Sequence, residues 1–175
     1  MEAGDEEAFA TLYRRRQGAV YRFALQMSGS PATAEEVTQE VFLALVETPG
    51  RYDSARGSVA GWLFGIARNR VLRWLEKDGR HQPVEEEQDG CGSDDARSGS
   101  VLDDLAERER LEAVRQAVLA LPTHYREAVV LCDLQEQSYE EAAGAIGCAV
   151  GTIRSRLFRG RELLAHKLRQ SRCLT

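Results

Sequence analysis

Long apolar stretches are absent from this 175-residue sequence. A helix that crosses a membrane needs about 18 to 20 consecutive apolar residues, and no segment approaches that length. The segment Met1 to Glu7 is acidic, whereas a secretion signal begins with basic residues that lead into an apolar stretch. We therefore expect a cytoplasmic protein that does not insert into a membrane.

Cysteine and histidine are too scattered for a metal or disulfide framework. The four cysteines form no CxxC pair, and none has a histidine at zinc-ligand spacing. No metal site and no cofactor are therefore expected. A redox or metal sensor that uses Cys132 and Cys148 is an alternative, which the spacing disfavours.

Strand-like alternation of apolar and polar residues is also missing. Apolar residues instead recur every three or four positions, which predicts an all-α protein. Residues 79–100 contain almost no large apolar side chain, so this segment cannot bury enough surface to offset the entropy cost of ordering it. We expect two small helical domains, residues 1–78 and 101–175, joined by a flexible acidic linker, residues 79–100.

The net charge of −5 conceals two basic segments. Residues 51–80 contain seven basic and three acidic residues, and residues 151–175 contain seven basic residues and one acidic residue. Residues 81–112, between them, contain eleven acidic and three basic residues. This distribution favours two separate contacts with a polyanion such as nucleic acid. Ordinary solvated helix surfaces are the alternative explanation.

Three helices are predicted in the N-terminal domain. The first spans about residues 5–28, as one helix or a broken pair. The second starts at a capping box formed by Thr33 and Glu36 and ends near Glu47, and the third runs over residues 59–77 from a Ser58 cap.

The second of these helices has a mixed acidic and aromatic stripe beside its core stripe. Such a stripe is typical of a docking face for a basic partner helix, although a wide core stripe with solvated acids explains the pattern equally well. The stripe consists of Glu35, Gln39, Phe42, Leu43 and Val46.

The third helix presents groups that suit unpaired bases. Trp62, Asn69 and Arg73 recur on one face, and Arg68 and Arg70 flank it. An aromatic ring can stack on a base, an amide can bind a base edge, and guanidinium groups bind the backbone. The polar loop before the helix could close over an extruded base. Tryptophan on a helix is more often a core residue, which is the alternative.

The C-terminal domain is predicted to contain a helix-turn-helix motif. After helices over about residues 102–121 and 123–134, Ser138 and Glu141 form a capping box for a short alanine-rich helix. Gly147 ends that helix, and a longer basic helix follows from about residue 150 to 169. In this order of elements the second helix enters the major groove of DNA.

The basic helix carries side chains that can read base edges. Arginine can bond guanine through two hydrogen bonds, serine can pair with several bases, and phenylalanine can contact a thymine methyl group. The predicted DNA-binding residues of this helix are Arg154, Ser155, Arg156, Phe158 and Arg159, of which Arg156 better suits phosphate. A solvated amphipathic helix is the alternative.

These segments, in this order, resemble bacterial sigma factors of the extracytoplasmic-function (ECF) type, which retain two helical domains called region 2 and region 4. The resemblance rests on DEEAFATLY (5–13), AEEVTQEVFLAL (34–45), WLFGIARNRVLRWL (62–75), LPTHYREAVVL (121–131) and YEEAAGAIGCAVGTIRSRLFRGRELL (139–164).

The resemblance implies binding to core RNA polymerase and to promoter DNA. Region 2 would dock on the clamp of the largest subunit and open the −10 element, with Asn69 lining a pocket for a flipped base. Region 4 would contact the flap of the second-largest subunit and read the −35 element. The implied polymerase contacts are Glu35, Glu36, Gln39, Phe42 and Leu43. The implied contacts with the −10 element are Trp62, Arg68, Asn69, Arg70 and Arg73. The implied contacts with the −35 element are Arg154, Ser155, Arg156, Phe158 and Arg159.

A sigma factor would not be an enzyme, because the chain itself makes and breaks no bond. Whether an anti-sigma factor binds it is left open by the sequence. The main alternative is a stand-alone helix-turn-helix regulator that binds duplex DNA unaided. That alternative explains residues 121–169 but gives no role to the second helix's acidic stripe or to Trp62 and Asn69.

Overall fold

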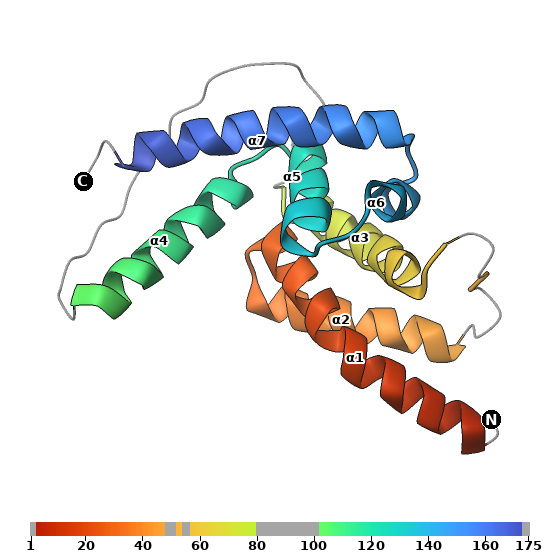
Figure 1. Cartoon of the computed structure of the whole chain (residues 1–175). Helices are drawn as coiled ribbons and strands as arrows, with labels where there is room; N and C mark the ends of the chain where they lie inside the picture. Colours follow the sequence, from red (N-terminus) through yellow and green to blue (C-terminus); the bar gives the residue numbers. More distant parts are fainter. Residues whose placement is uncertain (1–2, 48–51, 54–56, 80–101, 173–175) are drawn as a thin grey trace.

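The computed structural model describes residues 3–47, 52–53, 57–79 and 102–172, and within them it contains helices and no strand (Figure 1). The all-α fold is therefore confirmed. The predicted linker lies outside the described residues, apart from Gly79. The elements are α1 (Ala3–Ser28), α2 (Pro31–Glu47), α3 (Val59–Lys77), α4 (Leu102–Leu119), α5 (Thr123–Val129), a π-helical turn (Val130–Leu134), α6 (Tyr139–Ile146) and α7 (Val150–Arg172).

Two predicted N-terminal helix caps are present. Ser58 Oγ accepts a hydrogen bond from the backbone N–H of Gly61 at 3.1 Å and so caps α3. At α6, Ser138 and Glu141 cap each other's backbone N–H groups, as predicted. Gly147 ends α6 with φ of 78°, a conformation that glycine adopts without steric cost.

One helix start and the geometry of one helix end differ from the prediction. Helix α2 begins one turn early, at Pro31, because Ser30 Oγ accepts a hydrogen bond from the N–H of Thr33 at 3.2 Å and proline fits the first turn of a helix. The predicted capping box of Thr33 and Glu36 is therefore wrong. The helix predicted over residues 123–134 ends in a π-helical turn, in which the Gln135 N–H bonds the Val130 carbonyl at 2.9 Å.

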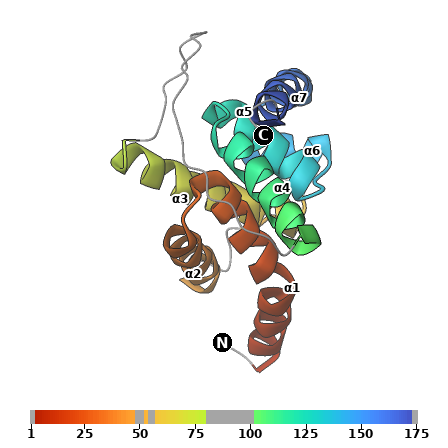
Figure 2. The same ribbon diagram turned by 90° about the vertical axis from the view of Figure 1, so that its left-hand side faces the viewer.

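The helices form a body with α7 on one side and the α1–α2 pair on the opposite side (Figures 1 and 2). Between these two sides lie α3, α5 and α6, and α3 packs along α6. Helix α4 diverges from α7 in Figure 1. The two halves of the chain are thus in direct contact.

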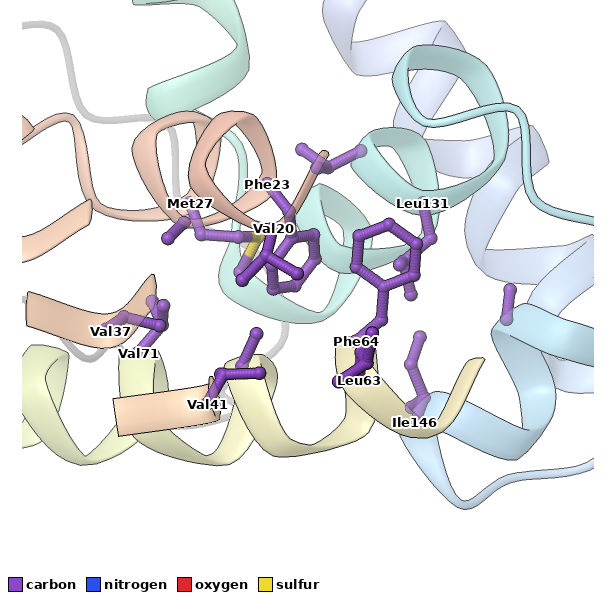
Figure 3. Packing of buried hydrophobic residues seen from close by; sticks show 14 of the residues in the cluster. Val20, Phe23, Met27, Val37, Val41, Leu63, Phe64, Val71, Leu131 and Ile146 are labelled. Carbon is purple, nitrogen blue, oxygen red and sulfur yellow. The ribbon is translucent and has the colours of Figure 1, made fainter. Parts of the chain in front are cut away.

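One apolar core spans both halves of the chain (Figure 3). Phe23 of α1 and Phe64 of α3 lie at its centre with ring centroids 5.4 Å apart. Leu131 of the π-helical turn and Ile146 of α6 belong to the same core. A smaller core within the C-terminal half contains Leu121, Ala128, Val129 and Leu157. Removing one half would therefore expose apolar surface on the other.

Candidate nucleic-acid interface

Helix α7 has the buried side that the helical period predicts. Ile153 and Leu157 are buried, and Gly160 lies so close to α5 that an added Cβ would come within 2.8 Å of Val129 Cγ2. A residue larger than glycine at position 160 would push α7 away from α5. The packing of α7 on α5 and α6 therefore fixes which side of α7 faces outward.

The outward side of α7 presents the predicted DNA-binding residues. Arg154, Ser155, Phe158 and Arg159 are exposed, whereas Arg156 is half-buried. Phe158 is 67% exposed, the highest value among the exposed large apolar side chains of the described residues. This arc exposes guanidinium, hydroxyl and aromatic groups, which are kinds of group that can contact base edges.

Two arginines of this exposed arc make local contacts. The Cζ atom of Arg154 lies 6.0 Å from the ring centroid of Tyr139, at the start of α6. Arg159 Nη1 lies 3.2 Å from a carboxylate oxygen of Glu162, one turn along the helix. Because both ion-pair partners are about half exposed, the pair is weak and can open to phosphate or base groups.

The outer surface of α3 carries three of the five residues predicted for unpaired bases. Asn69 and Arg73 are exposed, and Trp62 is half-buried. The Trp62 ring lies 5.7 Å from the ring of Tyr52, whose hydroxyl donates a hydrogen bond to the Gly57 carbonyl at 3.1 Å. The sequence analysis did not single out Tyr52. It could have been found as an aromatic residue in the polar loop that precedes the helix of Trp62.

The other two residues predicted for this surface point toward neighbouring helices. Arg70 Nη1 lies 3.0 Å from Glu40 of α2. Arg68 faces α5, where its Nε lies 2.7 Å from Oε1 of Glu127 and its Nη2 donates to Oε2 at 3.3 Å. The prediction placed the five residues side by side, whereas the structure brings only Trp62, Asn69 and Arg73 to the outer face.

The predicted docking stripe on α2 is only partly a surface. The stripe residues Glu35, Gln39, Leu43 and Val46 are exposed, as is Glu36 beside them, and Leu43 is 57% exposed. Phe42 is buried at 3% exposure, so its predicted place on the exposed stripe is wrong. The reason is α1, whose Phe9 and Tyr13 rings lie 6.3 and 4.8 Å from the Phe42 ring and cover it.

The surroundings of Cys132 do not favour a reactive thiol. Burial is the largest cause that raises the pKa of the Cys132 thiol, to about 11, and the charge of Asp133 adds to the effect. A thiol with this pKa is almost fully protonated near neutral pH, and the thiolate is the reactive form. Within the part of the chain that the structure describes, no group of three or more potential ligand residues could hold a metal ion.

None of the helices among the described residues is both long enough and apolar enough to cross a membrane.

Comparison with known proteins identifies the two halves of the chain. The family model Sigma-70 region 2 matches residues 12–81, and the model Sigma-70, region 4 matches residues 111–164. The ECF RNA polymerase sigma-E factor of Escherichia coli is 34% identical over 177 residues, which cover 96% of this chain and 90% of that protein. The chain belongs to the ECF sigma factors.

Further relatives support this membership. The ECF RNA polymerase sigma factor SigE of Mycolicibacterium smegmatis is 36% identical over 167 residues, covering 92% of this chain but only 63% of its own length. The solved structure of the sigma factor RpoE in complex with the anti-sigma factor NepR from Bartonella quintana has a TM-score of 0.70 and 27% identity, and covers 93% of this chain and 98% of that chain. The structure of CnrH in complex with the cytosolic domain of CnrY shares the fold, with a TM-score of 0.71 and 24% identity over 96% of this chain and 92% of that one.

The matched segments assign the helices of this ECF sigma factor. Region 2 includes α2, α3 and most of α1, and region 4 includes α5, α6 and most of α7. The α7 arc therefore belongs to region 4, and the Tyr52–Trp62 surface belongs to region 2.

Proposed function

We propose that this ECF sigma factor binds core RNA polymerase, directs it to promoters and opens the DNA there. The observation that carries the proposal is the exposed arc of α7, which follows a capped α6 and a left-handed Gly147 in the order of a helix-turn-helix motif. Region 2 supplies a second, separate surface on α3. Two surfaces of different character fit a protein that contacts one promoter at two places.

Region 4 would read the −35 element as a duplex. Arg154 and Arg159 would bond base edges, and Phe158 would contact a thymine methyl group. Arg156 and the exposed Arg169, farther along α7, would bind phosphates and position the helix without reading the sequence.

Region 2 would hold the opened −10 element. Extruding a base costs a few kcal/mol in lost stacking, so the protein must supply equivalent contacts. Trp62 and Tyr52 offer ring surfaces on which an unpaired base can stack, and Asn69 offers a donor and an acceptor for its edge. Arg73 would bind the backbone beside them.

The exposed part of the α2 stripe would bind the clamp of the largest polymerase subunit. Glu35 of the stripe and Glu36 beside it would face basic groups, and Leu43 would supply apolar contact. Because α1 covers the Phe42 ring, Phe42 would support this surface from inside the protein. Region 4 would contact the flap of the second-largest subunit.

In this role the chain acts in the cytoplasm, where polymerase and promoter DNA are found, and it is not itself an enzyme. Its membership of a family of transcription initiation factors supports the proposal that it is not an enzyme. An anti-sigma factor is a further proposed partner. It is supported by the solved complex of a related sigma factor with the anti-sigma factor NepR.

A gel-shift experiment separates this proposal from a stand-alone regulator. A sigma factor should shift a promoter fragment only weakly by itself and strongly once core polymerase is added. A regulator that works alone should shift the same fragment tightly without polymerase, and that result would overturn the proposal.

A further inference from the structure

Tyr139, the first residue of α6, lies against the exposed side of α7. Its side chain is half-buried and packs against both apolar cores, so its ring has little freedom to move. The guanidinium carbon of Arg154 lies 6.0 Å from the centre of this ring. A guanidinium over an aromatic ring at about this distance is attracted to it. The ring therefore favours those Arg154 rotamers that keep the two groups together.

A second arginine of α7 contacts the same tyrosine. Arg161 has a hydrogen bond with the Tyr139 side chain and two more with Asp133, where Nε donates to Oδ2 at 3.0 Å and Nη2 donates to Oδ1 at 2.5 Å. The hydrogen bond to Asp133 is the largest cause that raises the pKa of Arg161 above its usual value; burial opposes it, and the charge of Asp133 and the bond with Tyr139 add to it. Asp133 thus orients Arg161, and Arg161 orients the Tyr139 ring.

The Asp133 carboxylate also lets two arginines share one tyrosine. Arg154 and Arg161 carry like charges, which repel each other near a common ring. Asp133 offsets the charge of Arg161 and pairs with it through two parallel bonds, the geometry that a guanidinium favours. Because the Arg161 side chain is 54% exposed, this pair contributes to orientation more than to stability. Asp133 itself belongs to the π-helical turn, a kind of element that is frequent at functional sites.

These contacts lie beside the residues that would read the −35 element. Tyr139, Arg154 and Arg161 line one groove of about 530 Å³ together with Phe158. Arg159, the other arginine proposed to bond base edges, is held differently, by its ion pair with Glu162 on the same helix. The contacts from α6 and the π-helical turn therefore act on one base-reading arginine of the two.

We propose that Tyr139 is a positioning residue that determines specificity: it orients Arg154 for one base position of the −35 element, while Asp133 and Arg161 hold the tyrosine in place. An exposed arginine loses rotamer freedom when it bonds a base, and this loss weakens binding by about twofold to tenfold. Tyr139 removes part of that loss before DNA arrives, for the base that fits the restrained rotamer. The inference rests on the proposed function, because an oriented Arg154 sharpens selection only in a region 4 that reads duplex DNA.

The first test measures the restraint on Arg154 without polymerase. Nuclear magnetic resonance relaxation of the Arg154 Nε–H group in the full-length chain reports its order on the picosecond to nanosecond timescale. Tyr139→Leu should lower the order parameter of this group, whereas Tyr139→Phe, which keeps the ring, should retain most of it. Asp133→Asn, which removes the charge that orients Arg161, should lower it by a smaller amount.

Tyr125→Leu is the matched control for this measurement. Tyr125 is another half-buried tyrosine of region 4, and its ring lies 3.9 Å from the ring of His124 on α5. Its replacement should leave the order of Arg154 unchanged. If Arg154 were equally mobile in the wild type and in Tyr139→Leu, the inference would be overturned.

The second test measures base selection by the holoenzyme on single-base −35 variants. Arg154→Ala identifies the position at which Arg154 discriminates. Tyr139→Leu should reduce discrimination at that position by about twofold to tenfold and leave the position affected by Arg159→Ala unchanged. Added to Arg154→Ala, Tyr139→Leu should cause no further loss, because the two residues act through one contact. A tyrosine that bound DNA directly would instead weaken all sequences alike and add to the loss in Arg154→Ala, which would overturn the positioning role.

These outcomes separate failure of the positioning role from failure of the proposed function. If the wild-type holoenzyme prefers a −35 sequence and Tyr139→Leu keeps the full preference, the positioning role is overturned while the proposed function stands. If the wild-type holoenzyme shows no −35 preference at all, the proposed function fails, and the specificity role of Tyr139 fails with it whatever the order of Arg154.

Discussion

Ser58 donates a hydrogen bond from Oγ to Oε1 of Glu141 at 2.6 Å, although 83 positions separate the two residues in the sequence. Each of them also caps a helix: Ser58 caps α3, and Glu141 accepts from the Ser138 N–H at 3.2 Å at the start of α6. One bond therefore joins the first turns of helices from the two regions.

Replacing Ser58 should cost more stability than replacing an ordinary helix cap. Ser58→Ala removes both the α3 cap and the bond to Glu141, so we expect the free energy of unfolding to fall by about 2 kcal/mol. Ser138→Ala, which removes the cap of α6 but no contact with region 2, should cost about 1 kcal/mol. Urea unfolding of the two variants measures the difference, and equal losses would mean that the bond between the regions contributes nothing.

The Glu141 carboxylate should make this contact sensitive to acid. The hydrogen bond from Ser58 is the largest cause that lowers the pKa of Glu141 below its usual value of 4.5; burial opposes it, and the bonds from Ser138 add to it. A group whose pKa is lower in the folded state stabilises the fold above its unfolded pKa, and this contribution is lost as the pH falls through the folded value.

Glu141→Gln should therefore reduce stability at pH 7 and make progressively less difference below about pH 4.5. Unfolding curves of the wild type and the variant at a series of pH values test this expectation. Glu140→Gln, an exposed acidic neighbour on the same helix, is the matched control. A difference between wild type and Glu141→Gln that stays constant down to pH 3 would refute the stabilising role of the ionised carboxylate.

Phe42 and Leu43 are adjacent in sequence but should respond differently to truncation. Phe42→Ala leaves a cavity beneath Phe9 and Tyr13, so we expect a loss of about 3 to 5 kcal/mol of stability. Leu43→Ala removes an exposed side chain, so its stability should change by less than about 0.5 kcal/mol while affinity for core polymerase falls by about tenfold. Thermal unfolding and a core-binding assay separate these effects, and normal core binding by Leu43→Ala would count against the α2 surface.

Local features of the sequence predicted the helix ends well. Ser58, Ser138 with Glu141, and Gly147 act through bonds to residues within one turn, so their roles can be inferred without knowledge of the fold. The start of α2 was misplaced because Ser30 and Thr33 are both good caps, and only the position of Pro31 decides between them.

Contacts between the two regions could not be predicted from the sequence. Helical periodicity predicts that Arg68 lies beside the face of Trp62 and Asn69, but it does not show that Glu127 of a distant helix pairs with Arg68. The same limit applies to Phe42, which the helical period alone assigns to the outer stripe of α2. It is buried because α1 extends across α2, and no pattern within α2 reports that contact.

The arginines of α7 should divide into those that read bases and those that bind phosphates. Arg154→Ala and Arg159→Ala should each cost about 1 to 3 kcal/mol of binding and relax the preference at one −35 position. Arg169→Ala should weaken binding to all promoters alike and lower its salt dependence. Holoenzyme affinity for a set of single-base −35 variants measures the pattern, and a uniform loss for all three substitutions would contradict the assignment.

Run-off transcription by core polymerase over a randomised promoter library is the most direct measurement of the proposed function. With the purified chain added, we expect start sites preceded by two preferred sequence elements, one near −10 and one near −35. If core polymerase bound the chain but selected no start site, or did not bind it at all, promoter recognition through the α3 and α7 surfaces would be contradicted.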